Sequence, residues 1–116
     1  MSDAFSTSSA AGPEGIAHET HQLLLTAIHE KRLIRFVFGG KERVAEPHDY
    51  GIHNASVRLL TYQIAGASGG ALPGWRWFEV ARMSEIALLE KTFAGGRPGS
   101  GKHHRWDTLF ARVGQP

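Results

Sequence analysis

The hydrophobic residues near the start of the chain recur three to four positions apart. In residues 19–31, Leu24, Ala27 and Ile28 fall on one helical face, and neighbouring leucines widen this apolar stripe. This spacing predicts an amphipathic helix. Residues 1–17 ahead of it are rich in Ser, Ala and Gly, a composition typical of a disordered tail.

The hydrophobic pattern then changes to strict alternation, which is typical of β-strands. The chain alternates in this way from Ile34 to Phe38, and Gly39-Gly40-Lys41 follows as a predicted hairpin turn. We expect the return strand to end at Pro47 and a polar connection to follow at 48–54. A Gly-rich loop is expected at 65–74. The full set of predicted strands is 34–38, 42–46, 57–64, 75–83 and 86–93.

The last part of the chain predicts a short helix after a flexible linker. Residues 95–102 are rich in Gly, and Trp106, Phe110 and Val113 then recur at helical spacing within 103–113. Sequential antiparallel strands with hairpin turns indicate a mainly β fold with flanking helices, built as a small barrel or a strongly bent sheet. We expect residues 18–94 to form this barrel domain, with the linker at 95–102 and the C-terminal helix and tail at 103–116.

Size and composition narrow the class of protein. The 116 residues fit one domain, and the formal net charge of +2 is too balanced to indicate nucleic-acid binding by itself. There is no Cys, which excludes disulfides and thiolate chemistry. No apolar run is long enough for a membrane helix, and the N-terminus lacks the regions of a signal peptide. We therefore expect a cytoplasmic protein without membrane contact.

The order of several segments resembles a known family. The predicted helix ends in Ala27-Ile28-His29-Glu30-Lys31-Arg32, and it runs into Ile34-Arg35-Phe36-Val37-Phe38. Arg43-Val44-Ala45-Glu46-Pro47 follows the turn, then Arg76-Trp77-Phe78-Glu79-Val80-Ala81-Arg82-Met83, and Phe93 stands where a closing Phe is expected. This arrangement resembles the WYL domain, a family of bacterial regulatory domains with a small barrel related to the Sm and SH3 folds.

The resemblance covers about residues 22–93. Of the Trp-Tyr-Leu that names the family, only the Leu remains, at Leu59, and Tyr62 matches a recurrent Tyr three residues on. The resemblance implies a ligand-sensing domain for a nucleotide or nucleic acid, often attached to a transcription regulator. We expect a stand-alone version that lacks the helix-turn-helix of those relatives.

Arginines are the strongest candidates for ligand binding. Arg76 and Arg82 share strand parity with the predicted core residue Phe78, and Arg58 has the same relation to Tyr62. A guanidinium suits bidentate binding of phosphate or carboxylate, so the predicted site binds an anionic, nucleotide-like or phosphorylated ligand. The candidate ligand-binding residues are Arg43, His48, Arg58, Tyr62, Arg76 and Arg82. Alternatively these arginines pair with Glu42, Glu46, Glu79 or Glu85 and only tie the barrel together.

The tryptophans suggest either a stacking platform or an interface. Trp75 and Trp77 have strand parity opposite to Phe78, so both are predicted to face away from the core. They are expected to stack bases or, alternatively, to pack against the C-terminal helix or another subunit, with Trp106 and Phe110 as partners.

Other sequence motifs give weaker evidence of function. Residues 96–102 match the Gly-x4-Gly-Lys spacing of a phosphate-binding loop, but His103 stands where the loop needs Ser or Thr. The seven His residues include no set with metal-ligand spacing, so no metal or other cofactor is expected. No acid, base and nucleophile set can be named, which argues against an enzyme.

Three functions therefore remain. The first is a non-enzymatic, ligand-sensing regulatory module. The second is a small barrel that binds single-stranded nucleic acid through the same arginines, with a steep salt dependence. The third is a homo-oligomeric structural module or the partner of a separate regulatory protein.

Overall fold

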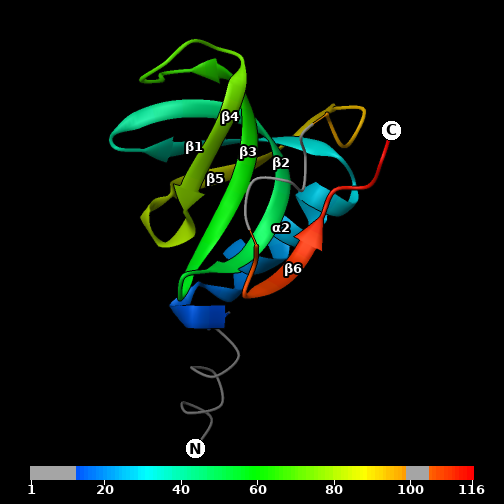
Figure 1. Ribbon diagram of the computed structural model, residues 1–116. Coiled ribbons are helices and arrows are strands. Elements are labelled where there is room, and N and C mark those ends of the chain that lie inside the picture. Colours follow the sequence, from blue (N-terminus) through cyan, green and yellow to red (C-terminus); the bar gives the residue numbers. More distant parts are fainter. Residues whose placement is uncertain (1–12, 99–104) are drawn as a thin grey trace, which may run out of the picture.

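The computed structural model describes residues 13–98 and 105–116, which form a curved antiparallel sheet packed on one helix (Figure 1). A single turn of 3-10 helix, η1 (Pro13–Gly15), precedes α2 (His18–His29). The strands are β1 (Arg32–Phe38), β2 (Lys41–His53), β3 (Ser56–Gly66), β4 (Gly74–Glu79), β5 (Ser84–Thr92) and β6 (Thr108–Arg112), with η2 (Val80–Arg82) between β4 and β5.

The sheet has the strand order β4-β3-β2-β1-β5, and β6 pairs with β2 off this path. All five pairings are antiparallel. The prediction of a mainly β fold with an N-terminal helix is therefore confirmed. Among the described residues no pairing joins β4 to β5, so the sheet is not closed into a barrel.

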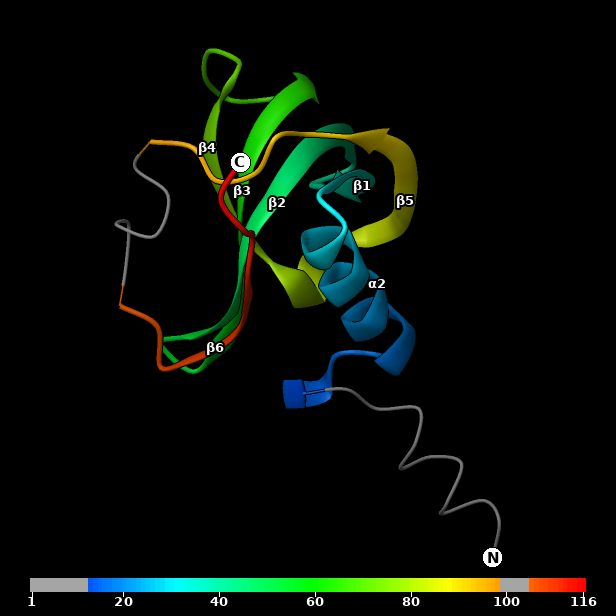
Figure 2. The ribbon, with the colours of Figure 1, turned by 90° about the vertical axis from the view of Figure 1, so that its right-hand side faces the viewer.

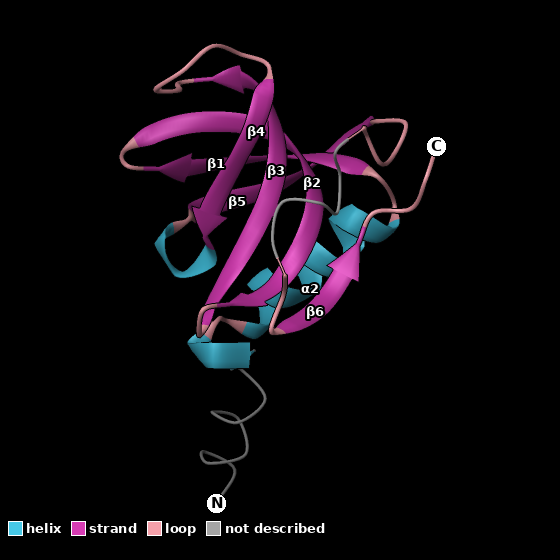
Figure 3. Ribbon diagram, in the orientation of Figure 1, coloured by secondary structure: helices cyan, strands magenta, loops and turns pink. Residues whose placement is uncertain are grey.

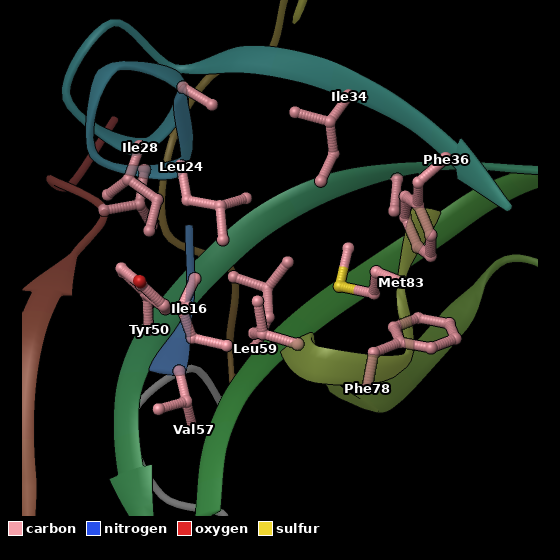
Figure 4. Packing of buried hydrophobic residues seen from close by; sticks show 14 residues of the cluster. Ile16, Leu24, Ile28, Ile34, Phe36, Tyr50, Val57, Leu59, Phe78 and Met83 are labelled. Atoms are coloured by element: carbon pink, nitrogen blue, oxygen red, sulfur yellow. The ribbon is translucent and has the colours of Figure 1, made fainter. Parts of the chain in front are cut away.

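Helix α2 forms because its apolar face has a sheet to cover. Leu24, Ala27 and Ile28 are buried on this face, and α2 packs against β1, β2 and β6 (Figure 2). The core continues along the concave side of the sheet through Phe36, Leu59 and Phe78 (Figure 4). Ordered structure begins before the predicted boundary at residue 18, since Ile16 is only 5% exposed within this core.

The hairpin between β1 and β2 follows the prediction. Gly39 and Gly40 have φ of +62° and +75°, the left-handed conformation that a two-residue hairpin turn requires and that glycine adopts without strain. Its strands pair from Ile34 with Ala45 to Phe38 with Lys41.

Strand β2 is much longer than predicted. Pro47 does not end it, and the expected polar connection at 48–54 is instead its second half, up to His53. A register shift between Pro47 and Asp49 marks a bulge, where an extra residue bends the strand. Pro47 lies between the part that pairs with β1 and the part that pairs with β6, so its missing N–H leaves both ladders intact.

The predicted C-terminal helix is wrong. Its described part contains strand β6, which pairs with residues 49–52 of β2 (Figure 3). The bend in β2 leaves these residues beyond the reach of β1, so their backbone groups are open for pairing. A short isolated helix has little stability of its own, and the ladder satisfies more backbone groups. The predicted strand 75–83 also ends early, because residues 80–82 form η2.

Candidate anion-binding site

Three of the predicted ligand-binding arginines lie at one end of the concave side of the sheet. Arg43 pairs in register with the buried Phe36, which places both side chains on the concave side. Arg76 lies opposite Thr61 in the β3–β4 ladder, and Arg82 ends η2. This end contains the β1–β2 hairpin and the β3–β4 loop, at the upper left of Figure 1, away from α2. We call these three residues the arginine group.

Arg43 is anchored by backbone carbonyls and aromatic rings. Its Nε and Nη2 donate to the carbonyl of Phe38 at 3.3 and 3.2 Å, and its Nη1 donates to the carbonyl of Ala67 at 3.0 Å. The guanidinium carbon lies 5.6 Å from the ring centre of Phe38 and 5.4 Å from that of Phe78. These contacts fix the position of the charge without neutralising it.

Arg76 binds the loop between β3 and β4. Its Nε and Nη2 both donate to the hydroxyl of Ser68, at 3.1 and 2.8 Å. Nη2 also donates to the carbonyl of Ala71 at 2.8 Å, and Nη1 donates to the carbonyl of Trp75 at the same distance. One oxygen therefore receives two bonds from the guanidinium fork, an arrangement in which a phosphate or carboxylate oxygen also fits.

The three arginines share neighbours. The exposed Arg82 has its guanidinium carbon 5.1 Å from the Phe38 ring centre, the ring that Arg43 also contacts. Arg43 and Arg76 both hold the β3–β4 loop, at Ala67 and at Ser68 respectively. Arg43 thus shares one ring with Arg82 and one loop with Arg76.

No carboxylate compensates the arginine group. Within residues 13–98 and 105–116, neither these three arginines nor Arg58 has an acidic group within 4.0 Å. Glu42 and Glu46 pair with other arginines, and Arg58 donates to the carbonyl of His53 although it lies opposite Glu79 in register. The ion pairs proposed as the alternative role of these four arginines are therefore not formed in the described structure.

The other predicted ligand-binding residues lie on the convex side of the sheet. Tyr62 pairs in register with Glu46 and with Trp75, on the opposite face from Leu59 and the core. His48 contacts Glu46 and the Trp75 ring on this same side, and Arg58 shares the parity of Tyr62. The sheet therefore separates Arg58, Tyr62 and His48 from the arginine group.

A buried ionic cluster occupies this convex side. Glu46 is 3% exposed, and Arg97 donates to both of its carboxylate oxygens at 2.7 Å. The guanidinium of Arg97 also lies 4.0 Å from the ring centre of Tyr62. His48, fully buried, lies with Nε2 3.0 Å from the same carboxylate and contacts the rings of Trp75 and Phe93. We call Glu46, His48 and Arg97 the Glu46 cluster.

Burial and pairing set the protonation of this cluster. Burial lowers the pKa of His48, and the hydrogen bond with Glu46 offsets this only in part. His48 is therefore neutral near pH 7 and donates its Nε2 proton to the carboxylate. Burial alone would raise the pKa of Glu46, but the hydrogen bonds from Arg97 and His48 outweigh it and the pKa is lowered. The Glu46 carboxylate is therefore ionised and paired with the Arg97 guanidinium. A general acid would instead need a strongly raised carboxyl pKa.

The predicted stacking residues make contacts within the chain. Trp77 lies 5.2 Å from Trp106, ring centre to ring centre, and Trp75 lies 5.3 Å from Tyr62. Phe110 of β6 packs 5.1 Å from Tyr50. Trp106 thus contacts Trp77 of β4 on the convex side, whereas Tyr50 and Phe110 pack in the core beside α2, which Figure 2 shows next to β6.

A surface hollow lies elsewhere, away from the arginine group. Its volume is about 350 Å³, and it is open to solvent beside β1. Its lining residues are Arg35, Phe36, Val37, Gly40, Glu42 and Glu85. The hollow contains two carboxylates and none of the arginine group, so its electrostatics do not favour an anion.

Neither a metal cluster nor a membrane-spanning helix is found in the part of the chain that the structure describes. No group of three potential metal ligands is present there, and no helix there is long and apolar enough to cross a membrane. Most of the phosphate-loop-like stretch, from Gly99 onward, lies outside the described residues. Its Arg97 belongs to the Glu46 cluster instead.

Sequence reasoning missed two polar residues beside the arginine group. Ser68 falls within the predicted Gly-rich loop at 65–74, and Gln63 falls within the predicted strand at 57–64. Gln63 has the strand parity of the core residue Leu59. A polar side chain at a position that faces the core is a sequence signal that could have identified it. The partners of Glu46 and Asp49, Arg97 and Arg112, were also missed because they lie 51 and 63 positions away.

Comparison with known proteins gives no relative. The chain matches no family model, no curated protein and no solved structure.

Proposed function

We propose that this protein is a non-enzymatic ligand-sensing module of WYL type, which binds an anionic, nucleotide-like or phosphorylated ligand through Arg43, Arg76 and Arg82. The observation that carries the proposal is that Arg43 shares the Phe38 ring with Arg82 and the β3–β4 loop with Arg76, and that no carboxylate of the described residues lies within 4.0 Å of these arginines. Arg58, Tyr62 and His48 are not part of this site, because they lie across the sheet.

Electrostatics favour an anion at this place. The donors of Arg43 and Arg76 now bond to neutral carbonyl and hydroxyl oxygens. A bond from a guanidinium to an ionised oxygen is roughly twice as strong as one between neutral groups. At about 1.5 to 3 kcal/mol for each charge-assisted bond, one bond from each of three arginines gives roughly 4.5 to 9 kcal/mol, which corresponds to an affinity between about millimolar and about micromolar.

The arrangement of elements supports the WYL-type reading. A helix precedes five consecutive strands, and the strand order β4-β3-β2-β1-β5 places the first strand beside the last of them. With the strong bend of β2 and the short η2 between β4 and β5, this order suits a small barrel of Sm or SH3 type. Strand β6 is an addition to that plan.

The test is a thermal-shift titration with pyrophosphate and with nucleoside monophosphates. A ligand of the folded state raises the melting temperature by mass action. We expect the shift in the parent chain and in Arg35→Ala, the matched control, since Arg35 is a surface arginine paired with Glu42 outside the site. We expect Arg76→Ala and Arg43→Ala to lose it.

Two outcomes overturn the proposal. One is the absence of any shift in the parent chain, and the other is an equal shift in Arg76→Ala and Arg35→Ala. The same variants are then titrated with short single-stranded DNA at several salt concentrations. A steep loss of affinity with salt, together with tighter binding than any mononucleotide, would replace the small ligand by nucleic acid.

A further inference from the structure

Gln63 has a buried oxygen with no hydrogen-bond partner. Its side chain is fully buried, and its Nε2 donates to the carbonyls of Ala65 and Ala67 at 3.0 and 2.7 Å. Among the described residues, Oε1 is the single buried side-chain oxygen or nitrogen without a partner. The amide orientation is fixed, because both contacts are carbonyls and only the NH₂ end can donate to them. A buried acceptor left unpaired is costly and requires a reason.

This oxygen belongs to the same place as the arginine group. The carbonyl of Ala67 accepts a hydrogen bond from Gln63 Nε2 and another from Arg43 Nη1. Thr61, two positions before Gln63 on the same face, donates through Oγ1 to the carbonyl of Arg76 at 3.1 Å. Gln63 and Arg43 are therefore linked through one shared acceptor, the carbonyl oxygen of Ala67.

The loop at 67–73 is hydrogen-bonded to this place. None of its residues is buried. It is held to the sheet by the bonds that Arg43, Gln63 and Arg76 donate to its oxygens, and by the bond from the Ala67 N–H to the carbonyl of Glu42 at 3.0 Å. Lifting the loop breaks these bonds, and a ligand with anionic oxygens replaces the acceptors that the arginines lose.

We propose that Gln63 is a specificity-determining residue, whose Oε1 accepts a hydrogen bond from an O–H or N–H group carried beside the anionic group of the ligand. This inference rests on the proposed function and narrows its ligand class to phosphate esters with a neighbouring donor. Sugar phosphates and nucleotides share this chemistry. The loop at 67–73 moves aside when such a ligand binds.

Matched ligands separate the contribution of the arginine group from that of Gln63 Oε1. At pH 8, methyl phosphate and ribose 5-phosphate carry the same anionic group, but only the second has hydroxyl donors. We expect calorimetric titration of the parent chain to show ribose 5-phosphate binding about tenfold more tightly, the effect of one satisfied buried acceptor. AMP and UMP form a second arm, and a further gain with either assigns the donor to the base instead of the sugar.

Matched variants test the residue itself. Gln63→Met keeps the size of the side chain and removes the acceptor, so we expect it to abolish the difference between the two phosphates. Thr61→Val, also a buried polar position on this face, is the control and should keep that difference. A Gln63→Met chain that loses affinity for both phosphates equally overturns the inference, because Gln63 then only holds the loop.

The parent chain alone is decisive if Gln63→Met fails to fold. Equal affinity for methyl phosphate, ribose 5-phosphate and both nucleotides overturns the inference and leaves the anion site in place, with Oε1 satisfied by water. Binding of none of these ligands overturns the proposed function as well.

Discussion

Arg97 binds the buried carboxylate of Glu46 through two hydrogen bonds of 2.7 Å, across 51 positions of sequence. The side chain of Glu46 is 5% exposed and that of Arg97 is 42% exposed. The pair therefore joins the segment after β5 to the middle of β2 and leaves the cation in contact with water. Asp49 and Arg112 repeat the arrangement between β2 and β6, with two bonds of 3.1 Å. Two buried acids thus tie the end of the chain to the convex side of the sheet.

Removing Arg97 should cost more stability than removing a surface arginine. Among the described residues, Arg97→Ala leaves the buried carboxylate of Glu46 with His48 as its remaining side-chain partner. We expect a loss of about 2 kcal/mol, after allowance for the exposure of Arg97. Arg35→Ala breaks an exposed pair with Glu42 and should cost less than about 1 kcal/mol. Urea unfolding measures both values. Equal losses would show that the Glu46 cluster contributes no more than a surface pair.

The Glu46 cluster should make stability depend on pH below neutrality. The pKa of His48 is lowered in the folded state, so the unfolded chain binds its proton first, near pH 6.5. The stability that this group contributes is fully present above about pH 6.5 and is lost as pH falls toward the lower folded value. We expect the free energy of unfolding to fall between pH 7 and pH 5, and to fall less in His48→Gln.

Some dependence of stability on pH should remain in His48→Gln. Burial also lowers the pKa of His21, which acts in the same direction. Glu46 adds a second loss at lower pH, since its folded pKa is lowered and its contribution disappears as pH falls through that value. Urea unfolding at several pH values checks this, and parallel curves for the parent and His48→Gln would contradict the role of His48.

The pairing of β6 with β2 depends on Gly51. A Cβ at this position would lie 2.2 Å from the carbonyl oxygen of Thr108 and 3.0 Å from Cε3 of Trp106. We expect Gly51→Ala to displace β6 and to cost about 1 to 3 kcal/mol, as overpacking of a tight contact does. Gly69→Ala is the control, because its Cβ would meet nothing within 4 Å, and it should change stability by less than about 0.5 kcal/mol.

Hydrogen exchange locates the effect of Gly51→Ala. The amides of residues 108–112 should lose protection in this variant, while those of β3 keep theirs. Unchanged protection of β6 would mean that the strand is held by Arg112 and its neighbours without a close approach at Gly51.

Trp106 should act as a cover for Trp77 within one chain. The two rings lie 5.2 Å apart, and such a pair contributes about 0.5 to 1.5 kcal/mol beyond its buried area. We expect Trp106→Leu to lower stability, to shift the emission of Trp77 to longer wavelength, and to increase self-association, because an apolar surface is uncovered. Sedimentation velocity measures the last effect. Dissociation of an oligomer in this variant would instead assign the tryptophans to a subunit interface.

The sequence predicted the elements whose structure is decided locally. The 3.6-residue period of residues 19–31, the alternation of 34–38 and the Gly39-Gly40 turn each appear in the structure, because helix amphipathicity, strand parity and left-handed backbone are properties of neighbouring residues. Strand parity correctly placed Arg76 on the side of Phe78, but it placed Arg58 and Arg82 inward as well, whereas Arg58 lies on the convex side and Arg82 is exposed on η2.

Tertiary structure decided what depends on distant partners. Strand β2 runs through Pro47 because a bulge and two different neighbours share its edge there, and residues 108–112 form a strand because that edge is open. The pairing of Glu46 with Arg97, and the separation of Tyr62 and His48 from the arginine group by the sheet, follow from the same long-range geometry. The sequence by itself determined the helix and the alternation of the strands. Only the folded chain decided which residues meet, because contacts across 50 or more positions leave no periodic signal in the sequence.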